Sequence, residues 1–329
     1  MQFRTELFPK PFSEKIRHTN HIMLLGSCFT EQIGQKLIQQ KWRVMQNPNG
    51  IIFNPVSICK ALDSYLSYKP AVEADLFEYN GMWGSWQYHT RFSATTPNEA
   101  LLRINTETKD AAEFIKKTDW LLLTLGSAFV YERKDAPATN YENVVANCHK
   151  IPTDKFYKRM LTVEEVVNAF AKTLSKIKQK YPDIYFIFTI SPVRHLRDGF
   201  VENNRSKAVL INAVHELVND TEIFYFPSYE LIIDDLRDYR FFAEDLAHPN
   251  YAATQYVWEK FVSTCIDDDA KEIMKELSVI LQAANHKPFN PQSEQHKSFM
   301  ATYQQKAKAL IERYPHIHLD EEIQKLSVL

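Results

Sequence analysis

Residues 22–30 read Ile-Met-Leu-Leu-Gly-Ser-Cys-Phe-Thr, and this stretch decides the fold predicted for the chain. Its four apolar residues are typical of a short buried strand, and a helical pattern with Thr30 as N-cap follows over residues 30–40. Ser27 therefore lies at a strand-to-helix turn, where Gly26 provides the backbone freedom. Ligands of open α/β sheets bind at such turns, outside the carboxyl ends of the strands.

The hydroxyl of Ser27 would have the chemistry of a nucleophile at this turn. It can attack a carbonyl, and the first N–H groups of the helix, which lack helical partners, can stabilise the resulting oxyanion. A Gly-Ser pair at a strand end is nevertheless more often a turn or a helix cap. A catalytic role for Ser27 therefore requires a base, an orienting acid and oxyanion donors elsewhere in the chain.

The composition is that of an ordinary globular protein. The chain has 329 residues, of which 45% are hydrophobic and 24% charged, and its net charge is −2. This small charge gives no reason to expect a nucleic-acid partner or an anionic membrane. The 4 scattered cysteines form no Cys-x-x-Cys pair, which favours a reduced, cytoplasmic protein. We also expect no signal peptide and no transmembrane helix, because neither pattern occurs.

Alternating strand and helix patterns predict the fold class. After the first strand, at residues 21–25, buried strands are predicted at residues 42–46, 119–125, 184–190 and 222–226. Helical patterns separate them, the clearest at residues 163–181, where Thr162 and Glu165 form a capping box. This alternation up to about residue 264 predicts an α/β fold with a mainly parallel, doubly wound sheet of five strands. Residues 130–160 interrupt it and are expected to form a long irregular connection.

Two segments fall outside this alternation. The predicted sheet domain covers residues 1–265, and residues 69–97 within it read as an inserted hairpin with a turn at Asn80-Gly81. The insertion is rich in aromatic residues, so it either covers the site or forms a surface hairpin with a packed aromatic face. Residues 266–329 carry amphipathic helices, predicted as an extension that packs on the domain or joins copies of the chain into a homo-oligomer.

Glycines stand at the ends of three predicted strands, although the chain has only 7. They are Gly26, Gly50 and Gly126. The loop with Gly50 and Asn54 would lie beside Ser27 if their strands are neighbours, and each residue could then direct a donor at the same point. A loop stabilised by Asx turns is the alternative. Ser127 follows Gly126, so a third strand end also carries a glycine and a serine.

Asp245 and His248 stand three residues apart before the last helix of the predicted sheet domain. This spacing places both side chains on one side of a helix or turn. A carboxylate there can hold the imidazole in the tautomer that accepts a proton from a serine. For His248 alone, a helix cap or a surface position is the alternative. Together with Ser27, the pair would complete a catalytic triad.

The motif Gly26–Thr30 resembles the name-giving motif of the GSCFA family, with Thr in place of Ala. Further blocks are similar to that family, and the resemblance extends over most of residues 24–261: Phe53–Pro55, Thr124–Ser127, Ser191–His195, Ser206–Ala208, Asp235–Arg240 and Asp245–Pro249. The family looks like a branch of the SGNH/GDSL hydrolases. The resemblance therefore implies a three-layer αβα sandwich, with Ser27 as nucleophile, Asp245 as acid and His248 as base.

The oxyanion donors implied by the resemblance are incomplete. In SGNH hydrolases they are the N–H of the nucleophile, a Gly after the second strand and an Asn after the third. Ser27 and Gly50, with Asn54 close by, match the first two. Residues 126–129 read Gly-Ser-Ala-Phe where Gly-x-Asn-Asp is expected, and the GDSL-type Asp after the first glycine is also absent. One donor is worth about 2.7–4 kcal/mol in the transition state, so either Asn54 or Ser127 substitutes or activity is weak or lost.

The leading hypothesis is a serine esterase acting on a small or carbohydrate O-acyl ester, without a metal or organic cofactor. An acyltransferase would use the same acyl-enzyme with another hydroxyl as acceptor. The candidates for shaping the substrate pocket are Trp86, His89, Arg194 and His195. A ligand-binding module that has lost the chemistry is the second hypothesis. The third makes Cys28 the nucleophile with His248 as its base, although the side chain of Cys28 should point away from the position that Ser27 faces.

Overall fold

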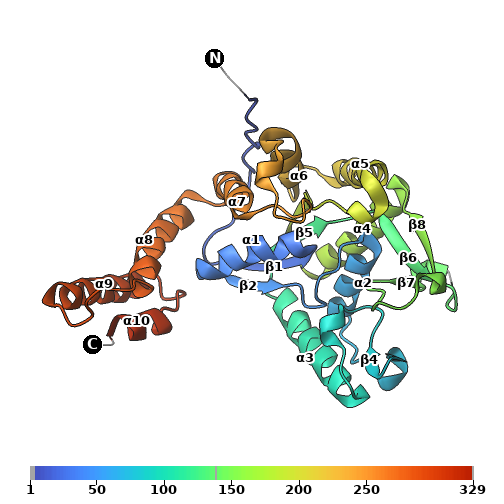
Figure 1. The fold of residues 1–329 in the computed structure, drawn as a ribbon, viewed down its shortest axis with the longest axis horizontal. Helices are drawn as coiled ribbons and strands as arrows, with labels where there is room; N and C mark the ends of the chain where they lie inside the picture. Colours follow the sequence, from blue (N-terminus) through green and yellow to red (C-terminus); the bar gives the residue numbers. More distant parts are fainter. Residues whose placement is uncertain (1–3, 138, 328–329) are drawn as a thin grey trace.

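A five-stranded parallel sheet forms the centre of the protein (Figure 1), in a computed structural model that describes residues 4–137 and 139–327. The strand order is β10-β9-β5-β1-β2. Their bounds are β1 (His21–Gly26), β2 (Arg43–Gln46), β5 (Trp120–Leu125), β9 (Tyr185–Ile190) and β10 (Ile223–Tyr225). The chain runs outward from β1 to β2 and then crosses to β5, so the strand order reverses between β1 and β5. The predicted α/β class and parallel five-stranded sheet are confirmed.

Helices cover both faces of the sheet. On one face lie α2 (Pro55–Leu66), α3 (Pro97–Ile115), α4 (Val163–Lys180) and α5 (Gly199–Leu217); on the other lie α1 (Cys28–Gln39) and α7 (Tyr251–Cys265). Side chains alternate along each strand, so Met23 and Leu25 pack under the first group while Ile22 and Leu24 pack under the second. The result is a helix–sheet–helix sandwich.

The predicted start of the first helix is wrong. Ser27, rather than Thr30, is the N-cap of α1, because its hydroxyl already accepts the N–H of Phe29. Helix α3 is one continuous helix, with Thr96 as its cap and a proline at its first position. Helix α5 begins at Gly199, directly after a short 3₁₀ turn at Leu196–Asp198. The capping box of Thr162 and Glu165 at the start of α4 is confirmed.

The connection at residues 130–160 is not irregular, as the sequence suggested. It contains a three-stranded antiparallel sheet ordered β7-β6-β8: β6 (Phe129–Arg133), β7 (Val144–Val145) and β8 (Phe156–Met160). The strands are short and pair across long loops, so no continuous apolar pattern marks them. The inserted hairpin is confirmed and consists of β3 (Phe77–Tyr79) and β4 (Met82–Gly84), joined at Asn80-Gly81.

The remaining helices lie towards the C-terminus. After β10 come the short α6 (Ser228–Glu230) and a π-helical turn at Leu231–Leu236, followed beyond α7 by α8 (Asp268–Ala284), α9 (Glu294–Arg313) and α10 (Asp320–Ser327). Helices α8–α10 bury their own apolar cluster and extend away from the sheet, beyond the edge at β2 (Figure 1). An ion pair between Lys41 and Glu322 joins α10 to the turn after α1. Within the described residues, no helix is both long and apolar enough to cross a membrane.

Candidate active site

A cavity of about 970 Å³ opens at the carboxyl ends of β1, β5 and β9. The loops that follow these strands line it, together with the loop after β2 and the segment that carries His248. Six of the residues predicted from the sequence line this cavity: Ser27, Asn54, Ser127, Arg194, His195 and His248. The other five, Gly50, Trp86, His89, Gly126 and Asp245, are not part of its lining. The sheet edge predicted to hold the site therefore carries a cavity.

Ser27 is held at this edge by its two neighbouring elements. Its hydroxyl accepts the N–H of Phe29 at 3.3 Å, as the N-cap of α1, and its N–H donates to the carbonyl of Thr124 at 3.2 Å. Gly26 has φ of +146°, and a Cβ on it would overlap the carbonyl oxygen of Thr124 on β5. A glycine is therefore required for the turn that directs Ser27 into the cavity.

His248 and Asp245 interact directly at the rim of the cavity. The Nδ1 of His248 lies 2.6 Å from Oδ2 of Asp245. Oδ1 of Asp245 accepts the N–H groups of His248 and Ala247, each at 3.0 Å. These backbone hydrogen bonds, followed by the imidazole, lower the pKa of Asp245 to about 2. The ionised carboxylate favours the tautomer with the proton on Nδ1, so Nε2 of His248 is the atom able to accept a proton.

Ser27 and His248 face the same cavity without touching. In residues 4–137 and 139–327, no hydrogen bond joins the Ser27 hydroxyl to the imidazole of His248. Catalytic hydrogen bonds are often long in a protein without substrate and shorten when substrate binds. Both residues line one cavity, so the nucleophile and the oriented base are present at the same site before substrate binds.

Every predicted oxyanion donor already donates within the protein. The N–H of Gly50 donates to Asn47 at 2.7 Å, and those of Gly126 and Ser127 both donate to Phe53, at 2.9 and 3.4 Å. The amide Nδ2 of Asn54 donates to Ser57 at 2.9 Å and to Val145 at 3.4 Å. Asn54 and Ser127 line the cavity, whereas Gly50 and Gly126 are not among its lining residues. Their roles as oxyanion donors stay predictions.

Residues 21–261 match the family model described as "GSCFA family". The chain belongs to the GSCFA family. The resemblance noted from the Gly-Ser-Cys-Phe motif is thus confirmed at the level of this family. Residues 278–328, which that resemblance did not cover, match a second model, described as "GSCFA domain protein, C-terminal domain".

Two further comparisons add little to this assignment. Curated protein sequences contain no match to this GSCFA chain. Among solved structures, the crystal structure of a carbohydrate esterase family 3 from Talaromyces cellulolyticus is similar with a TM-score of 0.35 and 9% sequence identity. The similarity covers 78% of this chain and 99% of that chain. It is too weak to carry an argument about function.

Lys207 is a buried charge that the sequence did not single out in the GSCFA chain. Its ammonium lies beneath the cavity and donates to the carbonyls of Gly126 and Ser191, both at 2.6 Å. Burial lowers its pKa to about 7. Ser206, its neighbour on α5, accepts the N–H of Ala128 at 2.7 Å. Helix α5 thereby holds the loops that follow β5 and β9. The similarity of residues 206–208 to the family could have indicated this role. It was not recognised, because a lysine in an amphipathic helix is normally exposed.

Of the three aromatic residues predicted to shape the pocket, one lines the cavity and two do not. His195 lines the cavity, and burial lowers its pKa to about 4, so its imidazole is neutral. Trp86 lies behind the cavity, stacked on Phe77 with ring centroids 4.0 Å apart. His89 packs against Gly50, and its N–H donates to Asn49 at 2.8 Å. The insertion thus has a packed aromatic face and also supports the loop after β2.

Cys28 also lines the cavity, and its side chain packs against the apolar cluster on the α1 and α7 face of the sheet. Burial raises the pKa of its thiol. Since the thiolate is the nucleophilic form of a cysteine, this environment works against a reactive Cys28. In the described part of the chain, no three His, Cys, Asp or Glu side chains are arranged to hold a metal ion.

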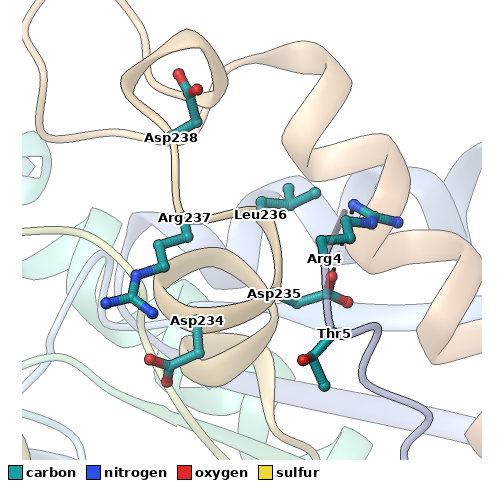
Figure 2. A pocket seen from close by; sticks show the side chains of 7 residues that line it. All are labelled: Arg4, Thr5, Asp234, Asp235, Leu236, Arg237 and Asp238. Carbon is teal, nitrogen blue, oxygen red and sulfur yellow. Dashed lines mark ion pairs between the residues drawn. The ribbon is translucent and has the colours of Figure 1, made fainter. Parts of the chain in front are cut away.

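A second cavity, of about 610 Å³, lies between the N-terminal arm and the π-helical turn (Figure 2). Its buried carboxylate, Asp235, forms an ion pair with Arg4 and accepts the N–H of Leu7 at 3.0 Å and the hydroxyl of Tyr256 at 2.6 Å. These contacts attach the arm to α7. The cavity contains none of the predicted site residues, so we assign Asp235 a structural role.

Proposed function

We propose that this protein is a serine esterase that cleaves an O-acyl ester by way of an acyl-enzyme. The observation that carries the proposal is that Ser27 and the oriented imidazole of His248 face one cavity at the carboxyl edge of the sheet. This is the combination of nucleophile, base and orienting acid that acyl transfer to a serine requires.

In the proposed reaction, Oγ of Ser27 attacks the ester carbonyl while Nε2 of His248 takes the hydroxyl proton. Asp245 stabilises the imidazolium that forms. The tetrahedral intermediate collapses, its alcohol leaves with the proton from His248, and the acyl group stays on Ser27. Water activated by His248 then releases the acid; an acceptor hydroxyl in its place would make the enzyme an acyltransferase. Neither route needs a metal or an organic cofactor.

The oxyanion requires donors that the occupied backbone N–H groups do not supply without a shift. Asn54 and Ser127 are the side chains on the cavity wall best suited to this role, because both line it and carry a donor. The second bond of the Asn54 amide, to Val145, is long at 3.4 Å. We propose that this amide turns to the oxyanion when substrate binds, in place of the absent Asn after the third strand.

The test is turnover of p-nitrophenyl acetate by the wild type beside Ser27→Ala and His248→Ala. Each variant should lose activity on the order of a thousandfold or more, because the members of a triad act as a unit. Mass spectrometry should find an acyl adduct on the peptide with Ser27. The control is Ser175→Ala, which changes an exposed serine of α4 outside the cavity lining and should keep full activity.

A second candidate function is a ligand-binding module without catalysis. It is favoured by the occupied N–H groups and by the absence, within the described residues, of a hydrogen bond between Ser27 and His248. Absence of turnover together with absence of an adduct, or equal turnover in Ser27→Ala, would support this alternative over the esterase. A fluorophosphonate probe that labels the wild type and not Ser27→Ala would exclude it.

A further inference from the structure

Unpaired cations surround the cavity with the proposed nucleophile. Lys150, Arg194 and Arg197 line it, and within residues 4–137 and 139–327 none of them forms an ion pair. The lining has one acidic residue among those described, Asp198, which is paired with Lys158. The chain as a whole has a net charge of −2, so this local excess of positive charge does not follow from its composition.

The histidines of the cavity wall do not alter this balance. Burial lowers the pKa of both His149 and His195, which keeps them neutral near pH 7. The carboxylate of Asp245, beside His248, already accepts two backbone N–H groups and the imidazole of His248. The positive charge therefore faces the cavity without a counterion from the protein.

Arg194 has the most defined geometry of the three cations. Its guanidinium lies over the rings of Phe242 and Tyr239, 4.1 and 5.0 Å from their centroids. Its Nη1 is buried and has no hydrogen-bond partner among the described residues. A buried donor without an acceptor costs free energy of folding. A guanidinium that is stacked on aromatic rings presents its N–H groups in one fixed plane, which suits a carboxylate or a phosphate. The donors of Arg194 thus lack the partner that a bound anion would supply.

The backbone of Arg194 connects this cation to the proposed base. Its N–H donates to the carbonyl of Ala247 at 3.2 Å, next to His248. In the proposed reaction His248 protonates the leaving alcohol, so a group bound beside it belongs to the alcohol part of the ester rather than to the acyl part.

We propose that the substrate is an acyl ester whose alcohol part carries an anionic group, a carboxylate or a phosphate, bound by Arg194. This inference rests on the proposed esterase function. Arg197 and Lys150, both exposed, add to the attraction without fixed contacts. Apolar side chains that also line the cavity, such as Phe53 and Phe129, would contact the uncharged remainder of the alcohol.

The experiment compares 4-acetoxybenzoate with its neutral methyl ester, and adds 4-acetoxyphenyl phosphate as the phosphate arm. The wild type should prefer an anionic ester, with a lower KM that rises with ionic strength. Arg194→Met should reduce kcat/KM for the anionic ester about tenfold or more, mainly through KM, as expected for loss of a charged hydrogen bond. Arg194→Lys should retain part of the preference, because it retains the charge.

Arg240→Met is the matched control, since Arg240 is exposed, paired with Asp238 and outside the cavity lining. It should leave both reactions unchanged. Equal kcat/KM values for the charged and neutral esters, with both lost in Ser27→Ala, would overturn the anion site and leave the esterase intact. A preference for p-nitrophenyl hemisuccinate, whose charge is on the acyl part, would overturn the placement of the anion.

Binding measurements separate the anion site from catalysis. If no ester is turned over, isothermal titration calorimetry with 4-hydroxybenzoate and its neutral methyl ester still tests whether the cavity binds an anion. Tighter binding of the anion, lost in Arg194→Met, would support the site although the esterase has failed. Equal binding of the two compounds by the wild type, or equal binding of 4-hydroxybenzoate by the wild type and Arg194→Met, would overturn it.

Discussion

Asp245 contributes to the site as an ionised carboxylate that is held in place by backbone N–H groups. Asparagine could still accept these two N–H groups, but its amide would donate to His248 and move the imidazole proton to Nε2. Asp245→Asn should therefore lower kcat, though somewhat less than the thousandfold expected for Ser27→Ala. Steady-state kinetics with p-nitrophenyl acetate measure this. An unchanged kcat in Asp245→Asn would remove the acid from the mechanism.

Gly26 is the residue on which the turn before Ser27 depends. Gly26→Ala places a Cβ on the carbonyl of Thr124 at a φ that favours glycine, so it should destabilise the fold by roughly 2 kcal/mol or more. The matched control is Gly81→Ala, where φ is +74° and a Cβ meets nothing within 4 Å. Urea denaturation of both variants should give a clearly larger loss for Gly26→Ala; equal losses would contradict the close approach to β5.

At the scale of elements, α5 holds the strand ends beneath the cavity through Lys207. Burial lowers the pKa of Lys207 from 10.5 to about 7. Between these values the unfolded chain keeps a proton that the folded chain has lost, so the free energy of unfolding should rise with pH over this range. Lys207→Met lacks this linkage, and its stability relative to the wild type should fall between pH 7 and pH 9.

Urea denaturation at both pH values measures this difference, with exposed Lys109→Met as the matched control. The control should follow the wild type at both values. A constant difference between Lys207→Met and the wild type would mean that Lys207 stays charged in the folded protein.

Helices and strands were predicted well from the sequence where the pattern that identifies them lies within one chain segment. The apolar strands β5 and β9 and the capping box of α4 are of this kind, and their predicted bounds agree with the structure within a residue or two. The antiparallel sheet of β6, β7 and β8 was missed. Its strands pair residues more than ten positions apart, as Tyr131 does with Val145, and no local pattern records such pairing.

At the scale of the whole molecule, the C-terminal helices contact the sheet domain through apolar side chains of α8, such as Ala270 and Met274, and through an ion pair of α10. Glu322 is buried and pairs with Lys41 at 2.7 Å. Lys41→Met would leave this carboxylate buried without its partner, at a cost of about 3 kcal/mol. Hydrogen exchange should become faster in α9 and α10 and stay unchanged in the central sheet.

Lys275→Met is the control for that measurement, because its pair with Glu272 is exposed on both sides. It should not change exchange in any helix. Faster exchange throughout the sheet domain in Lys41→Met would mean that the C-terminal helices and the sheet unfold as one unit.

Local sequence patterns were sufficient to predict the five strands of the central sheet, the turn at Gly26-Ser27 and the pairing of Asp245 with His248. Each of these depends on residues close together in the chain, through periodicity, caps and short spacing. Three features appear only once the chain is folded: the burial of Lys207 under two strand ends, the lack of a counterion for Arg194 among the described residues, and the internal acceptors of the predicted oxyanion donors. These properties arise from contacts between distant segments, which exclude water and determine where each charge and each N–H finds a partner.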